Sequence, residues 1–355
     1  MKKTLMLILC LAMLLSVGSS ALAVNEDVEG ELLIYTSMYQ FVIDMMDEAI
    51  KAEFPNLEPG NDGSFFFYGG TGTLQSKLAG EMENGTLECD MLMVAEPAYS
   101  LELKEGGWLE QIDIEDADSL FRFDYDEDGY WYPVRVCNMV LAYNPEKWGD
   151  GDGQWPLEEL PKTFKDFAYD ENLKGMISMS NPLTSGTAMA AAAALSDVYG
   201  YEYFDALGKN EVMIESGSTA LTKLQTGECK VIMILEESVL AARKDDGSQI
   251  ECIYPEDGVI LIPSTVMTVA EDRSKNMNIE AAEAITEWLL SDAGQKYMIE
   301  GFMHSVKAGM TEVPYDSVDT DGLIANDMGV DWVRCYQQRD EIRTKFQESV
   351  TIPES

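Results

Sequence analysis

Three short clusters of small and hydroxyl side chains stand directly before stretches that predict helices. The clusters are Gly69–Thr73, Thr184–Thr187 and Glu215–Thr219. Ser and Thr are favoured helix N-caps, and the first turn of a helix leaves backbone N–H groups without intrahelical partners. Because the side chains here are small, a ligand can approach those donors closely. Helix starts of this kind suit an anionic or strongly polar group.

Charged residues stand near other strand ends and could complete such a site. Arg135 is a lone cation in the apolar, extended segment Tyr130–Tyr143. It is either a solvent-facing edge arginine or a bidentate clamp for an anion. Glu96, Glu236 and Glu237 follow apolar strand-like runs. Their carboxylates could hold an amine or sugar hydroxyls at the other end of a ligand.

The elements that must position these residues alternate between strand and helix. Short apolar runs at 31–37, 64–68 and 89–94 each end in a small or polar loop and are followed by a helical pattern. In an open α/β sheet the ligand crevice lies at the carboxyl ends of the strands. The Ala-rich stretch from residue 186 is expected to continue as helix through Val198–Leu207.

Two long extended segments, Tyr130–Tyr143 and Ile250–Pro263, bracket a middle α/β portion and can each pass between domains. We therefore expect two α/β domains joined by two extended crossing segments. The first domain is discontinuous and comprises residues 24–134 plus 257–355, and the second comprises 135–256. The ligand is expected between them, where hinge closure would bury it.

The chain begins like an exported protein. Residues 1–23 combine Lys2-Lys3, an apolar run and a small-x-small end, which predicts a secretory signal peptide and a mature chain starting near Val24. The net charge of −40 over 355 residues argues against nucleic acid or an anionic membrane surface as partner. The expected location is periplasmic or extracellular.

Enzymatic and metal chemistry find little support in the sequence. The five cysteines of the mature chain include no CxxC pair, and His304 is its only histidine, far along the chain. Asp124–Gly129 imitates the start of a calcium loop, but Arg135 stands where a bidentate carboxylate is needed. We expect buried free thiols for most of the cysteines, with one unassigned disulfide as the alternative, and an acidic turn at Asp124–Gly129. We expect no catalytic residues, no cofactor and no metal.

Longer motifs in this chain resemble a known family. They are Ile34–Ser37, Tyr68–Leu78, Tyr130–Asn144, Ser178–Ala188, Glu215–Glu228 and Ala281–Met298. Together they resemble the extracellular solute-binding proteins of ABC importers, in the branch related to iron, phosphosugar, aminoethylphosphonate and polyamine binding. The resemblance covers most of the mature chain. It implies a two-lobed α/β fold of the type II periplasmic-binding class, a role in transport, an importer permease as partner and a monomeric protein.

The family holds its ligand with the loops after strands and with helix N-termini. Including Glu96 from the residue pattern, the expected ligand-binding positions are Thr36, Ser37, Thr71, Gly72, Thr73, Glu96, Arg135, Ser185, Gly186, Thr187, Ser216, Gly217, Ser218 and Glu236. Iron-binding members carry a Tyr-Tyr pair where this chain has Glu236-Glu237, and often a His near Tyr39, which counts against ferric iron.

The expected ligand is therefore a small oxyanion such as a phosphosugar or an aminoalkylphosphonate. Ferric iron and a polyamine are the alternatives within the same fold. An exported hydrolase is the alternative from a different class of protein, although the sequence contains neither HExxH nor GxSxG.

Overall fold

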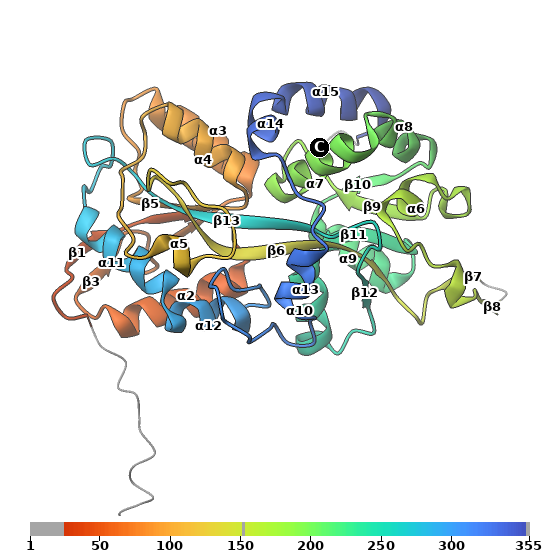
Figure 1. Cartoon of the computed structure of the whole chain (residues 1–355), viewed down its shortest axis with the longest axis horizontal. Coiled ribbons are helices and arrows are strands. Elements are labelled where there is room, and N and C mark those ends of the chain that lie inside the picture. The colour runs from red at the N-terminus through yellow and green to blue at the C-terminus, as the bar shows by residue number, and fades with distance from the viewer. Residues whose placement is uncertain (1–24, 151–152, 353–355) are drawn as a thin grey trace, which may run out of the picture.

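A mixed β-sheet runs through the whole molecule in the computed structural model, which describes residues 25–150 and 153–352 (Figure 1). The expected signal peptide lies outside the described residues. Within the described part the sheet has nine strands, eight of them in the order β10-β9-β11-β6-β13-β5-β2-β4 and β12 paired with β6. Their bounds are β10 Met213–Glu215, β9 Ile177–Ser180, β11 Val231–Leu235, β6 Tyr132–Tyr143, β13 Ile260–Thr268, β5 Met91–Val94, β2 Ile34–Thr36, β4 Phe66–Tyr68 and β12 Glu251–Ile253.

Each half of the sheet is a small parallel α/β unit covered by helices. β2 pairs in parallel with β4 and β5, and β9 pairs in parallel with β10 and β11. We call the β2/β4/β5 half the first lobe and the β9/β10/β11 half the second lobe. The helices along the first half are α2 Gln40–Glu53, α3 Thr71–Met82, α4 Pro97–Glu105, α5 Ala117–Leu120, α11 Ile279–Leu290 and α12 Asp292–Glu300. Those of the second half are α6 Phe164–Tyr169, α7 Gly186–Tyr199, α8 Glu202–Lys209, α9 Gly217–Thr226 and α10 Glu236–Asp246.

Smaller elements complete the described chain. They are the strand pairs β1 Gly30–Leu32 with β3 Leu57–Pro59 and β7 Gly149–Asp150 with β8 Gly153–Gln154, two 3-10 turns at Leu157–Glu159 and Glu171–Leu173, and the C-terminal helices α13 Thr320–Ala325, α14 Trp332–Gln337 and α15 Arg339–Ser349. No helix within the described ranges is both long and apolar enough to cross a membrane.

The long strands β6 and β13 join the two lobes. They pair antiparallel from Ile260 opposite Met139 to Val266 opposite Tyr132, and both are buried along almost their whole length. The first expected crossing, Tyr130–Tyr143, is thus observed. The second was placed too early: residues 251–253 form the short strand β12, and the crossing strand starts only at Ile260. Pro255 and Gly258, the latter at φ 119°, turn the chain between them.

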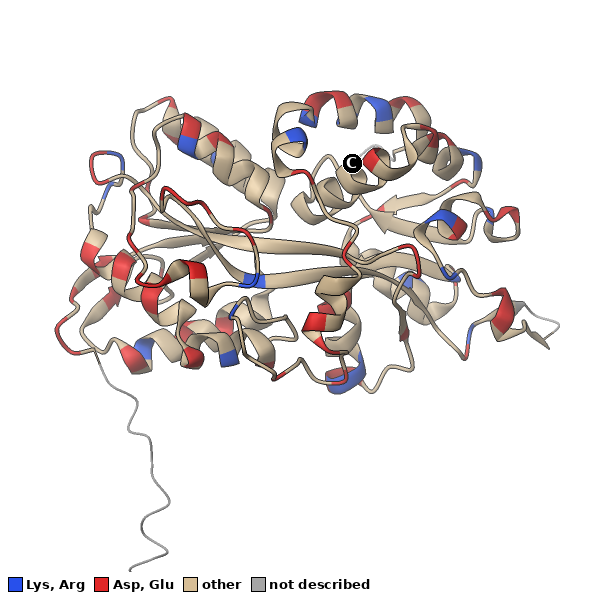
Figure 2. Cartoon of the chain, viewed as in Figure 1, with Lys and Arg blue, Asp and Glu red and all other residues tan. Residues whose placement is uncertain are grey.

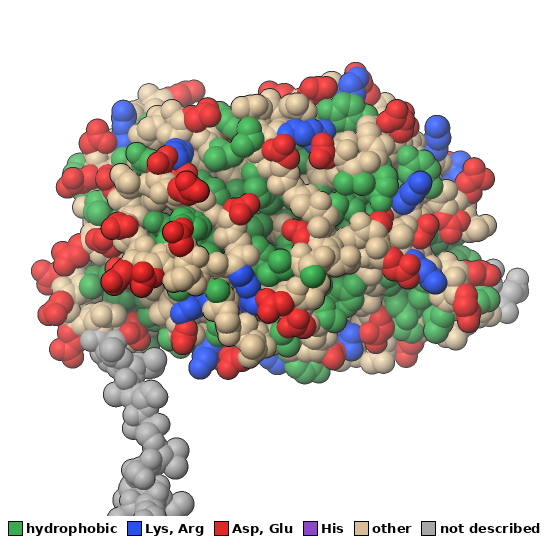
Figure 3. All heavy atoms as spheres, in the orientation of Figure 1, with side chains coloured by type: hydrophobic (Ala, Val, Ile, Leu, Met, Phe, Trp, Pro, Cys, Tyr) green, Lys and Arg blue, Asp and Glu red, His purple; other side chains and the backbone are tan. Residues whose placement is uncertain are grey.

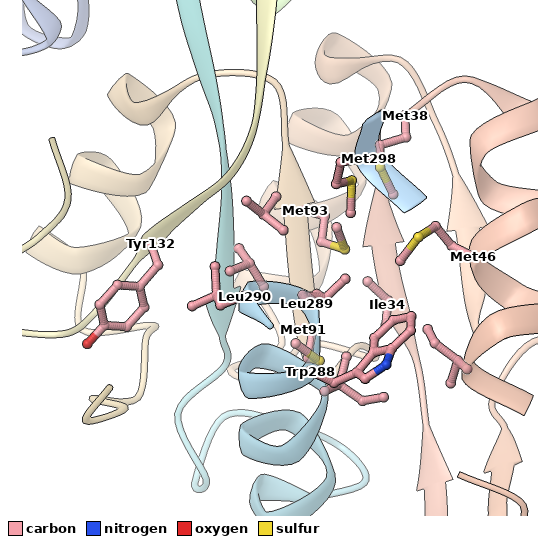
Figure 4. Packing of buried hydrophobic residues seen from close by; sticks show 14 of the residues in the cluster. Ile34, Met38, Met46, Met91, Met93, Tyr132, Trp288, Leu289, Leu290 and Met298 are labelled. Carbon is pink, nitrogen blue, oxygen red and sulfur yellow. The ribbon is translucent and has the colours of Figure 1, made fainter. Parts of the chain in front are cut away.

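Each lobe has its own hydrophobic core. In the first lobe the thioethers of Met46, Met91 and Met93 pack with Ile34 and Trp288, as Figure 4 shows. Unbranched, polarisable methionine side chains fill such irregular space well. The second-lobe core is built on the Ala-rich helix α7, which is buried over most of its length.

One expectation about the helices is wrong. α7 does not continue through Val198–Leu207: it ends at Tyr199, and Gly200 at φ 72° separates it from α8. The C-terminal helices bear on the expected membership of residues 257–355 in the first domain, because they contact both lobes. α15 packs on α7 and α8 and buries Phe346 in the second-lobe core, whereas α14 packs on α4 of the first lobe as well as on α7.

The negative charge is spread over both lobes. Acidic residues lie on helices and loops along the whole length of the molecule (Figure 2), and their side chains are scattered over the face shown in Figure 3. Such a distribution solvates the surface and leaves local donors free to act at contact distance, since surface charges are screened over about 8–10 Å.

Candidate functional site

A cavity of about 350 Å³ lies between the lobes, where the strands of each half end and the next helices begin. Eight of the expected ligand-binding residues line it: Ser37, Thr71, Arg135, Ser185, Thr187, Ser216, Gly217 and Ser218. Other lining residues include Tyr39, Tyr68, Gly70, Cys137, Asn181, Thr184, Glu215 and Glu237. The volume falls within the range of about 300–1,000 Å³ that is usual for small-molecule sites.

Three helix N-termini meet at this cavity. Gly70 is the N-cap of α3, Ser185 that of α7 and Ser216 that of α9, and all three line it. Ser185 Oγ accepts a hydrogen bond from the N–H of Ala188 at 3.3 Å, and Ser216 Oγ accepts one from the N–H of Thr219 at 3.2 Å. The cavity is therefore surrounded by the positive ends of three helix dipoles.

Two of these helix starts touch each other across the cleft. Gly72 N–H of α3 donates a hydrogen bond to Thr184 O at 3.2 Å, just before α7. A Cβ on Gly186 would lie only 3.0 Å from Thr71 Oγ1 and 3.2 Å from Glu96 Cγ. The glycines therefore let the two lobes approach each other closely. Gly72 and Gly186 belong to this closing contact rather than to the lining of the cavity.

Arg135 brings a buried positive charge to the cavity. It stands on β6 and is only 3% exposed, which rules out the solvent-facing edge arginine that the sequence left open. Its Nη1 contacts the Met303 sulfur, and its Nε finds no hydrogen-bond partner in the described part of the chain. A buried guanidinium with a free N–H at a cavity is suited to clamp an oxyanion.

Glu237 faces the same cavity and is 1% exposed. Its Oε1 has no hydrogen-bond partner among residues 25–150 and 153–352. Burial raises the pKa of Glu237 above its usual value, although the nearby Arg135 guanidinium lowers it. Cys137 lies beside them, and burial raises the pKa of its thiol to about 12, so it remains protonated at neutral pH.

Glu236, which the sequence placed in the site, points away from the cavity into a buried polar network. It accepts hydrogen bonds from Asn138 Nδ2 at 2.9 Å and Tyr254 Oη at 2.6 Å, and its Oε2 lies 3.1 Å from His304 Nε2. Burial alone would raise the pKa of Glu236, but the bonds from His304, Ser317 and Tyr254 bring it below its usual value. Glu236 and His304 thus bond to each other in this network and do not line the cavity.

The remaining expected residues lie outside the lining of the cavity. Thr36 is fully buried, and its Oγ1 accepts a hydrogen bond from the N–H of Met38 at 3.1 Å. Thr73 lies on α3. Glu96 is the buried N-cap of α4, where burial raises its pKa to about 7 even though Arg339 and Arg343 lower it. In contrast, Ser37 Oγ lines the cavity without a hydrogen-bond partner in the described chain.

Two tyrosines that the sequence did not include in the site also line the cavity. Tyr68 is 51% exposed at the end of β4, and Tyr39 is the N-cap of α2. Ser238 Oγ of α10 donates to Tyr39 Oη at 2.9 Å, so this bond joins the two lobes. For Tyr68 the sequence does carry a signal, because this aromatic residue ends β4 directly before the Gly69–Thr73 cluster.

Acidic residues elsewhere form ion pairs instead of a metal site. In the described residues no group of three or more His, Cys, Asp and Glu side chains could hold a metal ion. In the acidic loop Asp124–Gly129, the ammonium of Lys104 lies 2.6 Å from Asp126 Oδ1 and 2.7 Å from Asp128 Oδ2. The lysine thus balances the charges that resembled the start of a calcium loop.

Solved structures share this architecture. Iron-bound HitA from Pseudomonas aeruginosa matches with a TM-score of 0.74 at 18% identity, over 90% of this chain and 99% of that one. AfuA from Actinobacillus pleuropneumoniae, with fructose-6-phosphate bound, matches with a TM-score of 0.75 at 20% identity, over 90% and 98%. A periplasmic thiamin binding protein matches with a TM-score of 0.71 at 15% sequence identity, over 91% of this chain and 97% of that one. These likenesses show the two-lobed type II periplasmic-binding fold that the sequence led us to expect.

Sequence comparison gives the family. An uncharacterized protein from Haemophilus influenzae is 29% identical over 146 residues, a segment that spans 39% of this chain and 40% of that relative. The family model of the bacterial extracellular solute-binding proteins matches residues 66–320, which include both crossing strands and most of the cavity. The chain therefore belongs to the bacterial extracellular solute-binding proteins.

Proposed function

We propose that this solute-binding protein captures a small oxyanion, a phosphate ester or phosphonate, and delivers it to the permease of an ABC importer. The observation that carries the proposal is the meeting of three helix N-termini and the Arg135 guanidinium at one cavity. Hydrogen bonds to a charged group contribute about 1.5–3 kcal/mol each, so a few of them suffice for tight binding.

The other end of the ligand is expected to carry hydroxyls or an amine. We expect Glu237 to hold this end in place of Glu236, because Glu237 lines the cavity and its Oε1 has no hydrogen-bond partner in the described chain. Leaving a buried polar atom unsatisfied costs free energy, which a hydroxyl or ammonium of the ligand would offset. A phosphosugar and an aminoalkylphosphonate both offer an anion at one end and such donors at the other.

Ferric iron is the second candidate, because Tyr39, Tyr68 and Glu237 bring oxygen atoms to the cavity. Two features disfavour it. Burial raises the pKa of Tyr39, which opposes formation of a phenolate ligand, and Arg135 places a positive charge in the same cavity. A polyamine would meet the same charge. The neighbours' own ligands differ, so their names do not choose among these classes.

The test is calorimetric titration of the purified full-length mature protein with fructose-6-phosphate, aminoethylphosphonate, ferric citrate and spermidine. We expect binding of a phosphate or phosphonate. Arg135→Ala should weaken it by at least about tenfold through loss of one charge-assisted contact, while Arg273→Ala, an equal charge change outside the cavity, should not. If only ferric citrate or spermidine binds, the oxyanion proposal is wrong.

The same proposal includes where the protein is located, which partner it has and how many chains it contains. The signal-like segment at residues 1–23 and the family's extracellular role support a location outside the cytoplasm. We expect a secreted monomer without catalytic activity. Mass spectrometry of the mature protein should give an N-terminus near Val24, and light scattering should give the mass of one chain.

A further inference from the structure

We propose that His304 is a positioning residue of the ligand cavity, which holds Glu236 and thereby leaves Glu237 to face the ligand. This inference rests on the proposed function, because the hydroxyl or amine end of the expected oxyanion would meet Glu237. His304 itself lies outside the lining of the cavity. It acts through Glu236, at the junction between β11 and α10.

Two adjacent carboxylates stand at this junction, and only one of them lines the cavity. Glu236 and Glu237 are the first two residues of α10, and each is 1% exposed. The positive end of the helix dipole favours a carboxylate at either position. The dipole therefore does not decide which of the two enters the cavity, and the contacts of each side chain must do so.

The contacts of Glu236 use both of its oxygens. Its Oε1 accepts hydrogen bonds from Tyr254 Oη at 2.6 Å and from Ser317 Oγ, and its Oε2 accepts one from Asn138 Nδ2 at 2.9 Å. His304 Nε2 lies 3.1 Å from the same Oε2. Turning this carboxylate toward the cavity would break all of these contacts inside the protein, which costs free energy. The neighbouring carboxylate, whose Oε1 has no partner in the described chain, is left for the ligand.

His304 is held in this network by its backbone and by its ring. Val136 N–H of β6 donates a hydrogen bond to His304 O at 2.9 Å, and His304 N–H donates one to Val136 O at 3.1 Å. The ring Nδ1 lies 2.9 Å from Thr320 Oγ1 at the start of α13. Because the hydrogen bond made by one ring nitrogen orients the other, these contacts direct Nε2 toward Glu236.

His304 and the end of β11 meet β6 one after the other. β11 pairs with β6 as far as Leu235 opposite Met139, and His304 pairs with Val136 three residues away along the same strand. Glu236 directly follows Leu235, so it lies where β11 ends, and His304 meets it there.

β6 lies between the network and the cavity. Successive side chains of a strand point to opposite faces. Arg135, Cys137 and Met139 line the cavity, whereas Asn138 bonds Glu236. The network and the cavity are therefore on opposite faces of β6, and the start of α10 supplies one carboxylate to each.

A strained residue turns the chain toward β6 just after α12. Phe302 has φ 66°, a conformation that a bulky residue rarely adopts and that persists where its surroundings hold it. Its ring is buried, with the Phe41 ring centroid 5.9 Å away and the ammonium of Lys244 at 5.0 Å. The sulfur of the next residue, Met303, contacts the Arg135 guanidinium. One short segment thus reaches the cation of the cavity and the network behind its carboxylate.

The experiment measures, by calorimetry, how much the donor end of a ligand adds to affinity. It uses two matched pairs of probes: aminoethylphosphonate against ethylphosphonate, and fructose-6-phosphate against methyl phosphate. Within each pair the oxyanion is of the same kind, and only the first probe carries an amine or hydroxyls. We call the ratio of the two affinities the donor gain. The wild type should show a donor gain of at least about tenfold in one pair, from a hydrogen bond to the Glu237 carboxylate.

His304→Leu should reduce the donor gain to about one, because Glu236 loses a partner and the start of α10 no longer holds Glu237 toward the ligand. His304→Gln, whose amide can still donate to Glu236, should restore most of the gain. A double-mutant cycle shows whether His304 acts through Glu237. Glu237→Met alone should remove the gain, and adding His304→Leu should lower it no further. A further drop in the double variant would contradict the positioning role.

A milder variant keeps the test valid if His304→Leu does not fold. Tyr254→Phe removes only the hydroxyl that donates to Glu236, and it should lower the donor gain about threefold. Tyr203→Phe is the matched control, because Tyr203 Oη donates to Phe164 O at 2.8 Å inside the second-lobe core. It should lower stability without changing the donor gain. An equal fall of the gain in both variants would mean a general loss of stability, and the inference would be wrong.

The outcomes for the wild type separate this inference from the proposed function. If a pair binds without any donor gain, Glu237 does not meet the ligand, so the positioning role is wrong while the oxyanion function stands. If neither pair binds, the proposed function fails and the positioning role fails with it. A donor gain that stays at its wild-type value in His304→Leu overturns the inference alone.

Discussion

Arg135 and Glu237 give the cavity its chemical character at the scale of single residues. Both are almost completely buried, and each retains an atom without a hydrogen-bond partner in the described chain, Nε of Arg135 and Oε1 of Glu237. Burying charge with unsatisfied atoms costs free energy that the rest of the fold must offset. A ligand with an oxyanion and a hydroxyl or amine would supply a hydrogen-bond partner to both atoms. Binding would then recover the free energy that leaving them unsatisfied costs.

Glu96 should make stability depend on pH. Its pKa is raised from 4.5 to about 7 by burial, with Arg339 and Arg343 opposing and the buried Cys335 thiol nearby. A carboxyl with a raised folded-state pKa binds its proton more tightly when folded. The contribution of Glu96 to the free energy of unfolding is therefore fully present below pH 4.5 and is lost as the pH rises through 7. The loss is on the order of 3 kcal/mol.

The measurement is the free energy of unfolding in urea at pH 5 and pH 8 for the wild type and Glu96→Gln. The glutamine keeps the size of the side chain and cannot ionise. We expect the variant to gain stability relative to the wild type as pH rises from 5 to 8. An unchanged difference across that interval would show that Glu96 titrates normally.

At the scale of elements, the starts of α3 and α7 act as a closing contact. Gly186 opens α7 opposite Thr71 and Glu96, and a methyl group there would be tighter than ordinary van der Waals contact. Gly186→Ala should therefore oppose closure while slightly favouring the helix. Overpacking of this kind costs about 1–3 kcal/mol, so ligand affinity should fall by roughly tenfold or more.

A matched control exists in the same pair of helices. Gly80 lies within α3 with nothing within 4 Å of an added Cβ, so Gly80→Ala should gain helix stability without touching the second lobe. Calorimetric titration with the phosphate ester that binds the wild type compares the two. Equal affinities would mean that the closed contact between α3 and α7 is not part of the bound state.

Local patterns sufficed to predict strands β2, β4 and β5, the three helix starts and the first crossing. N-cap chemistry and apolar runs are properties of neighbouring residues, and Ser185 and Ser216 cap their helices as expected. Such patterns could not predict which of Glu236 and Glu237 lines the cavity. That depends on the tertiary fold, which directs Glu236 toward His304 and leaves Glu237 at the cavity. Tyr39 enters the site for a similar reason, through its bond to Ser238 on the other lobe.

At the scale of the whole molecule, the C-terminal helices connect the lobes a second time. Their apolar sides pack into the second lobe, yet Arg339 Nη1 lies 2.6 Å from Glu102 Oε2 on α4. Tyr336 Oη also donates to Glu105 Oε2 at 2.9 Å. Both bonds span the lobes, so any opening of the cleft would stretch or break them. We propose that α14 and α15 belong to the second lobe and bridge to the first.

Phe346→Ala tests that assignment. The Phe346 ring is fully buried against Phe204 of α8, with centroids 5.3 Å apart, and its truncation should cost about 3–5 kcal/mol. Because cores open as local units, hydrogen exchange should accelerate first in α7 and α8.

Phe54→Ala is the matched control, since Phe54 is equally buried against Trp288 in the first lobe. It should instead accelerate exchange in α2 and α11. If Phe346→Ala loosened the first lobe as much as the second, residues 331–352 would belong to the discontinuous first domain after all, because a shared core transmits the loss of packing to both sets of helices.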